Sequence, residues 1–443
     1  MVNPAETVRA GSEPTRPGRL LFVNQYYWPD HASTAQHLTD LAEALAHQGH
    51  EVHVLCSRGG YEPVAERPPT REARNGVEIH RVEATSLGRK TTLHRMVDYL
   101  SFYLRASLAA LFLPKADVVV TLTTPPIIGL IGTILRRLKG SKHVYWSMDL
   151  HPDASLALGR MSPKNPVVKA IARISDAVYR QADRVVVLGE YMADRIAAKG
   201  VPRDRLVVIP VWSRRDEIYP LDRQGHPLRG SLGLLDKFVV MYSGNLGLAH
   251  TFAEAIEAAR RLRHRPDIAF LFVGGGPRLK EVQRAKTDES LDNIRLMDYF
   301  PREQLHASLS LADVHLISMR PEMAGIVVPG KLYGAMASGR PTIFVGPERS
   351  ESADTIRAAG CGFQVGLGDA DSLVKAIERL ASSPTLVQEL GRRGREVFLR
   401  HHEKDGCCAS WANLIAELLA LTARPSFNRP SPSTRPLQAN AAS

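Results

Sequence analysis

Cysteine is scarce in this chain of 443 residues, and its four occurrences carry no recognisable pattern. Cys56, Cys361, Cys407 and Cys408 form neither a disulfide framework nor a CxxC or Cys/His spacing of the kind that binds zinc. HExxH and GxSxG are absent too, which argues against the common zinc-protease and serine-hydrolase sites. We therefore expect a protein of a reducing compartment, the cytoplasm, without a metal centre.

Long hydrophobic runs are also missing. The residues through about Pro17 are polar and contain no apolar core of a secretory signal, so export is not expected. The most apolar stretch, 88–114, has basic residues at its start and contains Asp98 and Arg105, which makes a membrane span improbable. As a helix, this segment could lie on an anionic membrane surface. The alternative is that it packs on the sheet of its own domain.

The charge balance favours anionic partners. The chain has 57 lysines and arginines against 46 acidic residues, which gives a formal net charge of +11. Nucleic acid, a membrane face and phosphorylated small molecules would all be attracted to such a protein. No nucleic-acid-binding motif or long basic block occurs, so we do not expect nucleic acid as the partner.

Alternating strand and helix patterns predict an α/β protein with two doubly wound domains. Strand-like runs such as LLFVN, EVHVLC, ADVVVTL and RVVVL are separated by helical patterns, and the same order starts again at FVVMYSG. Near-continuous apolar strands are typical of parallel sheets covered on both faces. We predict an N-terminal domain over 18–218, completed by a helix at about 405–423, a C-terminal domain over 219–404, and a disordered tail over 424–443. Ligands of such sheets bind at the carboxyl ends of the strands, here in a cleft between the domains.

The stretch VVPGKLYGAMASGRPTIFVG, 327–346, predicts an anion site. Pro329 and Gly330 interrupt the chain, and Lys331 begins a short helix. A helix start offers unpaired N–H groups and a positive dipole, to which the lysine adds a charge. Gly334 inside the helix costs about 1 kcal/mol relative to alanine, so we expect its space to be needed. The alternative is a solvated lysine at an ordinary helix start.

Two more glycine-containing loops follow strands of the same domain. YSGNLG places Ser243, Gly244 and Asn245 after one strand, and FVGGGP places Gly274, Gly275 and Gly276 after the next. Each loop alone is equally compatible with an ordinary turn. Since all three loops lie at the carboxyl ends of strands in one sheet, together they favour a phosphate-binding and nucleotide-binding edge.

The N-terminal domain offers acceptor-side candidates in two loops, NQYYWPDHAST with Asp30 and YWSMDLHPDAS with Asp149, His151 and Asp153. A carboxylate there could orient an attacking hydroxyl or accept its proton. The alternative is that Asp149 and Asp153 cap turns around Pro152.

These motifs, with GHEVHVL near the start, resemble the GT-B glycosyltransferases of family 4, especially bacterial exopolysaccharide and lipopolysaccharide enzymes. The likeness runs from about Leu20 to about Leu421 and is most specific near Lys331. It implies two Rossmann-like domains facing a cleft, with a nucleotide-sugar donor on the second and an acceptor on the first. It also implies a retaining hexosyl transfer that needs no metal or other cofactor. By position, Lys331 matches the family lysine that faces the donor diphosphate.

The chain departs from the family pattern at four positions. The two family glutamates would fall at Ile326 and Gly334, and a family arginine and lysine at Asn245 and His250. Glu322 or Glu351 could replace a missing carboxylate.

Three functions follow from this comparison. The favoured one is a glycosyltransferase of cell-surface polysaccharide synthesis with a polyprenyl-diphosphate-linked or oligosaccharide acceptor, bound peripherally to the inner face of the plasma membrane. The alternatives are a GT-B sugar-nucleotide epimerase and a degenerate protein that binds a nucleotide-sugar without catalysis.

Overall fold

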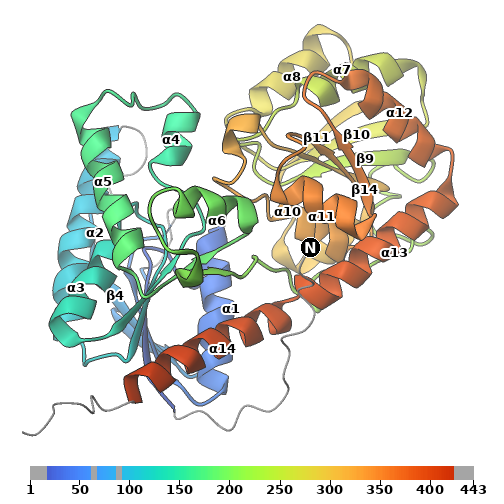
Figure 1. The fold of residues 1–443 in the computed structure, drawn as a ribbon. Helices are drawn as coiled ribbons and strands as arrows, with labels where there is room; N and C mark the ends of the chain where they lie inside the picture. The colour runs from blue at the N-terminus through green and yellow to red at the C-terminus, as the bar shows by residue number, and fades with distance from the viewer. Residues whose placement is uncertain (1–16, 61–66, 86–91, 424–443) are drawn as a thin grey trace, which may run out of the picture.

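The computed structural model describes residues 17–60, 67–85 and 92–423 (Figure 1), and the predicted tail over 424–443 lies outside them. The strands of the first sheet are β1 (Arg19–Val23), β2 (Glu51–Ser57), β3 (Arg71–Arg74), β4 (Val77–Val82), β5 (Val118–Thr121), β6 (Lys142–Trp146), β7 (Arg184–Val187) and β8 (Leu206–Val208). Its helices are α1 (Ser33–His47), α2 (Thr92–Phe112), α3 (Gly129–Lys139), α4 (Asp153–Ala157), α5 (Pro166–Gln181) and α6 (Glu190–Ala197).

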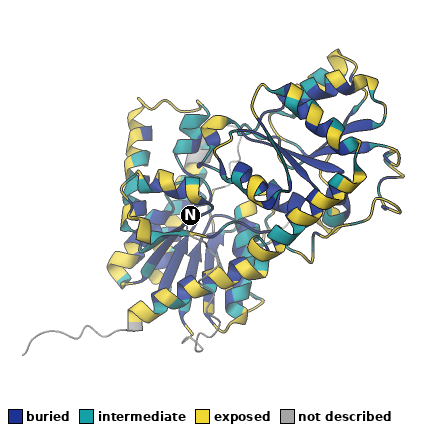
Figure 2. Cartoon of the chain, turned by 45° about the vertical axis from the view of Figure 1, so that its right-hand side comes forward, coloured by how far each residue is buried: buried dark blue, intermediate teal, exposed yellow. Residues whose placement is uncertain are grey.

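The first sheet has the strand order β3-β4-β2-β1-β5-β6-β7-β8. All neighbours are parallel except β3 and β4, an antiparallel pair at one edge. Strands such as β1 and β5 are almost wholly buried because helices cover both faces of the sheet. Exposed residues gather on the outward sides of those helices (Figure 2).

The second sheet consists of β9 (Phe238–Ser243), β10 (Ile268–Val273), β11 (Ile294–Met297), β12 (Val314–Ser318), β13 (Thr342–Val345) and β14 (Gly362–Val365). It is wholly parallel, in the order β11-β10-β9-β12-β13-β14. The helices around it are α7 (Ala253–Arg261), α8 (Leu279–Asp288), α9 (Leu305–Ser310), α10 (Lys331–Ala337), α11 (Glu351–Ala359), α12 (Ala370–Ala381) and α13 (Pro384–His401). Two doubly wound domains are therefore present, which confirms the predicted fold class.

The last helix, α14 (Lys404–Ala423), leaves α13 and returns to the first domain, where it packs beside α1 (Figure 1). Its Trp411 is fully buried and packs on Trp146 of β6, with ring centroids 4.7 Å apart. The chain thus joins the domains twice.

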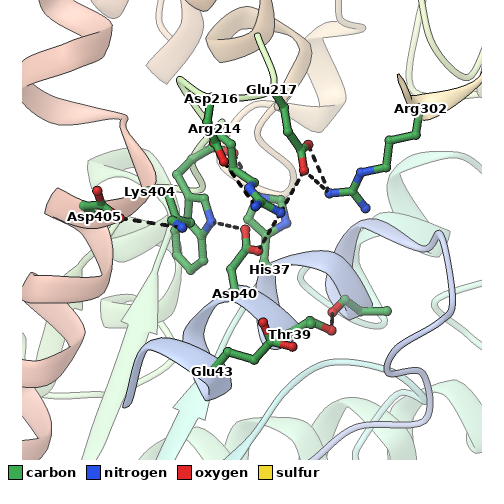
Figure 3. Close-up of polar contacts among 12 residues, drawn as sticks. His37, Thr39, Asp40, Glu43, Arg214, Asp216, Glu217, Arg302, Lys404 and Asp405 are labelled. Atoms are coloured by element: carbon green, nitrogen blue, oxygen red, sulfur yellow. Dashed lines mark hydrogen bonds and ion pairs between the residues drawn. The ribbon is translucent and has the colours of Figure 1, made fainter. Parts of the chain in front are cut away.

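The first joining segment is held by polar contacts from both domains (Figure 3). The indole Nε1 of Trp212 donates to Asp40 of α1 at 2.9 Å, and Arg214 forms an ion pair with Glu217 at 2.7 Å. Glu217 in turn pairs with Arg302 of the second domain at 2.9 Å. This network fixes the direction in which the chain enters the second domain.

Candidate active site

Lys331 begins α10, and its amine lies between the helix and the loop after β9. The Nζ atom is 3.2 Å from Nε2 of His250 and 5.2 Å from the ring centroid of Tyr242. No salt bridge to this amine occurs within the described ranges, although its surroundings are largely buried. Burial lowers the pKa of Lys331 to about 8. The amine is therefore a poorly solvated cation without a carboxylate partner.

His250 is neutral and can accept a hydrogen bond from this amine. Burial, with a smaller contribution from the nearby Lys331 charge, lowers the pKa of His250 to about 4. Its Nδ1 lies 2.5 Å from the carbonyl oxygen of Ser318, which assigns the ring proton to Nδ1. Nε2 is left with a lone pair that accepts a hydrogen bond from the Lys331 ammonium. The histidine thus orients the lysine without neutralising its charge.

Gly244 lies directly against the lysine side chain. Its φ of +122° belongs to the region that favours glycine, and a Cβ there would come within 2.6 Å of Cε of Lys331. Any larger residue would push the lysine out of this position. Ser243, just before it, is the last residue of β9 and is half-buried.

The loop at Gly274–Gly276 packs on the loop at Gly244–Leu246. A Cβ at Gly274 would lie 2.5 Å from the carbonyl oxygen of Gly244, and one at Gly276 would lie 2.5 Å from Oδ1 of Asn245. The Leu246 N–H donates to the carbonyl of Gly275 at 2.8 Å. Close loop packing accounts for these two glycines whether or not a ligand also lies there. At Gly275 a Cβ would make only ordinary contact with Tyr299, at 3.8 Å.

The other positions around α10 behave differently. Gly330 is its N-cap, and a Cβ there would make only ordinary contact with Val211. Gly334 is buried and faces Leu309 and Ile218, where a Cβ would also make only ordinary contact. Close packing therefore does not explain the glycine at 334, and its predicted role toward the donor stays a prediction.

The two carboxylates proposed as replacements lie in different surroundings. Glu322 is about half exposed, forms an ion pair with Arg320 at 3.6 Å, and lines a cavity of about 630 Å³ together with Arg278 and Thr251. Glu351 starts α11 and instead reaches across to the first domain, where Oε1 accepts the Met192 N–H at 3.0 Å. Burial raises the pKa of Glu351. Glu322 thus faces the cavity with Arg320 as its partner, whereas Glu351 is bonded to a backbone N–H of the first domain.

The loop after β6 brings the acceptor-side candidates toward the second domain. Leu150, between Asp149 and His151, donates its N–H to the carbonyl of Ile326 at 3.2 Å. Burial raises the pKa of Asp149, an effect that the neighbouring His151 opposes. Asp149 and His151 are therefore beside the segment that leads to Lys331.

Asp30 and Asp153 serve the structure of the first domain. Oδ1 of Asp30 accepts the N–H of Ala32 at the start of α1, at 2.9 Å. Asp153 begins α4 and pairs with Lys199 at 3.1 Å. A role of Asp30 toward the acceptor stays a prediction.

Three residues of the candidate site were not predicted from the sequence: His250 as partner of the lysine, Tyr242 beneath it, and Arg278. Arg278 donates to the carbonyl of His250 and also lines the cavity that contains Glu322. The clue to Arg278 was its place two residues after the GGG loop, at the start of α8.

Comparison with known families identifies the class of protein to which this site belongs. Residues 34–212 match the family described as "Glycosyl transferase 4-like domain", and residues 228–397 match "Glycosyl transferases group 1". The chain belongs to the family 4 type of GT-B glycosyltransferases. The two matches together span both domains, so the identification as a transferase, predicted from the motifs, is confirmed.

Curated relatives are similar at moderate identity. The probable glycosyltransferase WbjE of Pseudomonas aeruginosa is 24% identical over 69% of this chain and 76% of its own length. WcaI of Escherichia coli, a putative colanic acid biosynthesis glycosyl transferase, is 27% identical over 72% of this chain and 81% of its own length.

Solved structures share the fold of both domains of this chain. Sucrose-phosphate synthase from Thermosynechococcus elongatus superposes with a TM-score of 0.73 at 18% identity, covering 91% of this chain and 100% of the other. HepE of Anabaena, solved in complex with UDP-glucose, gives a TM-score of 0.67 at 15% identity, covering 90% and 100%. At these identities the likeness shows the GT-B fold alone.

Proposed function

We propose that this glycosyltransferase moves a hexose-type sugar from a nucleotide-sugar to a lipid-linked or oligosaccharide acceptor, with retention of anomeric configuration, in cell-surface polysaccharide synthesis. The observation that carries the proposal is the Lys331 amine, a half-buried cation that has a neutral histidine as its partner and no carboxylate in the described chain. Such a group favours an arriving diphosphate. The name of WcaI and the UDP-glucose complex of HepE support the process and the kind of donor.

The charge changes of the reaction match this arrangement. As the bond between the anomeric carbon and the diphosphate breaks, negative charge grows on the leaving oxygen and the sugar becomes oxocarbenium-like. The N–H groups of Gly244 and Leu246 already donate to the carbonyls of Val273 and Gly275. Lys331 and the other N–H groups of this loop would then stabilise the leaving diphosphate more in the transition state than before it. These groups would supply the electrophilic assistance from the chain itself, without a cofactor.

Asp149 is proposed to act on the acceptor. A carboxyl whose pKa is raised by burial can orient a hydroxyl and accept its proton at neutral pH. The contact between Leu150 and Ile326 would bring this group toward the sugar only when the domains are together. Closure of the cleft would also exclude water and so protect the donor from hydrolysis.

The acceptor proposed is a polyprenyl-diphosphate-linked sugar, which requires the enzyme to work at the inner face of the membrane. No helix within the described ranges is both long and apolar enough to cross a bilayer. Attachment would instead rest on the net charge of +11 and on the outward face of α2. Co-sedimentation with anionic vesicles that decreases as salt is added tests this part.

The central test replaces Lys331 with alanine. We expect transfer to fall at least about tenfold, since one preorganised charge on a leaving group is commonly worth more than about 1.4 kcal/mol. Thermal-shift screening of nucleotide-sugars should find a donor that stabilises the wild type and not Lys331→Ala. Unchanged transfer in this variant would contradict the mechanism.

Lys331→Met serves as the control for folding. Burial holds the lysine pKa near 8 in the folded protein, below its ordinary value of 10.5, so the charged form is disfavoured in the fold. This penalty is full below pH 8 and is relieved between pH 8 and 10.5. At pH 7 the methionine variant should thus be as stable as wild type or more so, by at most roughly 3 kcal/mol. If Lys331→Met loses transfer activity while its stability is unchanged or higher, the lysine is needed for transfer and not for folding.

A further inference from the structure

The outward side of α2 is an exposed apolar face. Leu100 and Leu104 are each 60% exposed and Phe112 is 88% exposed, at spacings that place them on one side of the helix. The opposite side, with Phe102 and Ala106, is fully buried on the sheet. The helix therefore packs on the sheet of its own domain and still presents apolar side chains outward. We refer to Val97, Leu100, Leu104, Leu108, Leu111 and Phe112 as the α2 face.

A cavity of about 230 Å³ opens at the end of this face. It is lined by Ala109, Phe112 and Leu113 at the end of α2 and, from the sheet, by residues that include Arg71 of β3 and His80 and Arg81 of β4. Arg71 and His80 are register partners in the antiparallel pair, so they lie side by side. Apolar side chains and arginines thus line one small pocket.

The arginine in this pocket is available to a ligand. Arg71 is exposed, and within the part of the chain that the structure describes it has neither a hydrogen bond nor an ion pair with another side chain. The adjacent Arg81 differs, because its buried guanidinium already binds Glu72 at 2.6 Å and the carbonyl of Trp28 at 3.1 Å. Arg71 is therefore the cation of this pocket that can accept an anion.

His80 is the second polar group of the pocket, and it belongs to a chain of polar contacts that ends at Glu51. Its Nε2 lies 3.1 Å from Nδ1 of His53, and Nε2 of His53 lies 2.9 Å from Glu51, which also binds Arg19. The remaining nitrogen of His80, Nδ1, hydrogen-bonds no other group of the described chain. Since Glu51 accepts from His53, and His53 then accepts from His80, Nδ1 of the neutral His80 ring carries a lone pair. It donates only when the ring is doubly protonated, a form that burial disfavours by lowering the pKa of His80 and that an anion in the pocket would favour.

We propose that this cavity binds the phosphate of an anionic phospholipid, with the acyl chains lying along the α2 face. The inference rests on the proposed membrane attachment and specifies its partner. The phosphate would pair with Arg71 and accept from His80, while Phe112 and the leucines contact the acyl region. Apolar side chains next to an unpaired arginine match the two halves of a lipid, and the net charge of +11 draws the protein to an anionic surface.

The test uses the full-length protein and dihexanoyl phosphatidylglycerol as a monomeric lipid probe. Arg71→Gln should weaken binding of this probe at least about fivefold, the effect of losing one cation near an anionic lipid. Arg105→Gln is the matched control, because Arg105 is an exposed arginine of α2 outside the cavity. The control should bind the probe like wild type. Inorganic phosphate should bind far more weakly, because it lacks the acyl chains.

Vesicles containing phosphatidylglycerol separate the two proposals. If the wild type fails to bind them, both the membrane attachment and the lipid site are wrong. If it binds them but Arg71→Gln and Arg105→Gln hold the probe equally well, only the lipid site is wrong. Binding of inorganic phosphate as tight as that of the lipid would also overturn the lipid assignment. The melting temperature of each variant checks its folding. The thermal shift with the nucleotide-sugar donor checks that the donor site is intact.

Discussion

At the scale of single residues, the Lys331 amine determines how the enzyme should respond to pH. Burial holds its pKa near 8, and the neutral His250 beside it does not lose a proton in this range, because its own pKa is near 4. The ammonium is therefore present below pH 8 and is lost above it. For the free enzyme, kcat/KM for the donor should fall about tenfold per pH unit above about pH 8.

The substitution Lys331→Arg checks that the fall in kcat/KM above pH 8, the alkaline limb of the pH profile, is caused by deprotonation of the lysine. A guanidinium at this position would stay charged at any pH tested, so the variant should lose the alkaline limb even if its overall rate is lower. A profile that bends near the same pH in both proteins would assign the limb to another group.

The sequence predicted single residues where a local pattern dictates them. Lys331 at a helix start and Gly244 after a strand follow from breaks and apolar periodicity, and the structure does place them in contact. The pairing of Lys331 with His250 could not be predicted, since it depends on the carbonyl of Ser318, which comes from another strand. The role of Glu351 could not be predicted for the same reason, because its partner Met192 lies in the other domain.

At the scale of elements, Glu351 connects two helices of different domains. It starts α11 and accepts an N–H at the start of α6, where Met192 would otherwise have a buried and unpaired donor. Glu351→Ala should lower stability by about 1–3 kcal/mol, whereas Glu351→Gln keeps an acceptor oxygen and avoids a buried charge, so it should change stability by less than about 1 kcal/mol. Urea unfolding at neutral pH measures both.

The same pair of variants tests the earlier candidacy of Glu351 for the donor. A structural role predicts that the glutamine variant keeps the wild-type KM for donor. A rise of KM in Glu351→Gln at unchanged stability would instead place the carboxylate on the sugar or ribose.

Elements were predictable where burial imposes a continuous apolar pattern. The wholly buried β10, with sequence IAFLFV, could be recognised from sequence alone. The edge strand β3 and its neighbour β4, with sequences REAR and VEIHRV, could not, because these half-exposed strands carry charged residues at alternate positions. The proposed lipid cavity is lined by residues of these two strands, so this part of its lining was not predictable either.

At the scale of the whole molecule, the return of α14 to the first domain ties the ends of the described chain together. Trp411 is fully buried and packs on Trp146, which itself stacks on Trp212 of the joining segment, with centroids 5.8 Å apart. Three tryptophans from a strand, a linker and the last helix thus form one contact. The orientation of the domains should therefore depend on this cluster as well as on the network around Arg214 (Figure 3).

Removal of the indole of Trp411 tests this dependence. Trp411→Ala should cost about 3–5 kcal/mol, because it leaves a cavity where α14, α1 and β6 meet. Trp411→Phe should cost clearly less, since it keeps most of the apolar contact and removes an Nε1–H that has no partner in the described chain. Urea unfolding gives the stabilities, and limited proteolysis reports release of α14.

Transfer and donor binding should separate in the same alanine variant. If α14 holds the domains in place, Trp411→Ala should lower kcat/KM for transfer while the isolated donor still binds, since the groups proposed to bind the donor lie in the second domain and remain intact. The phenylalanine variant, which keeps the packing, should transfer at close to the wild-type rate. Equal stability of the alanine variant and the wild type would mean that α14 contributes little to the joining of the domains.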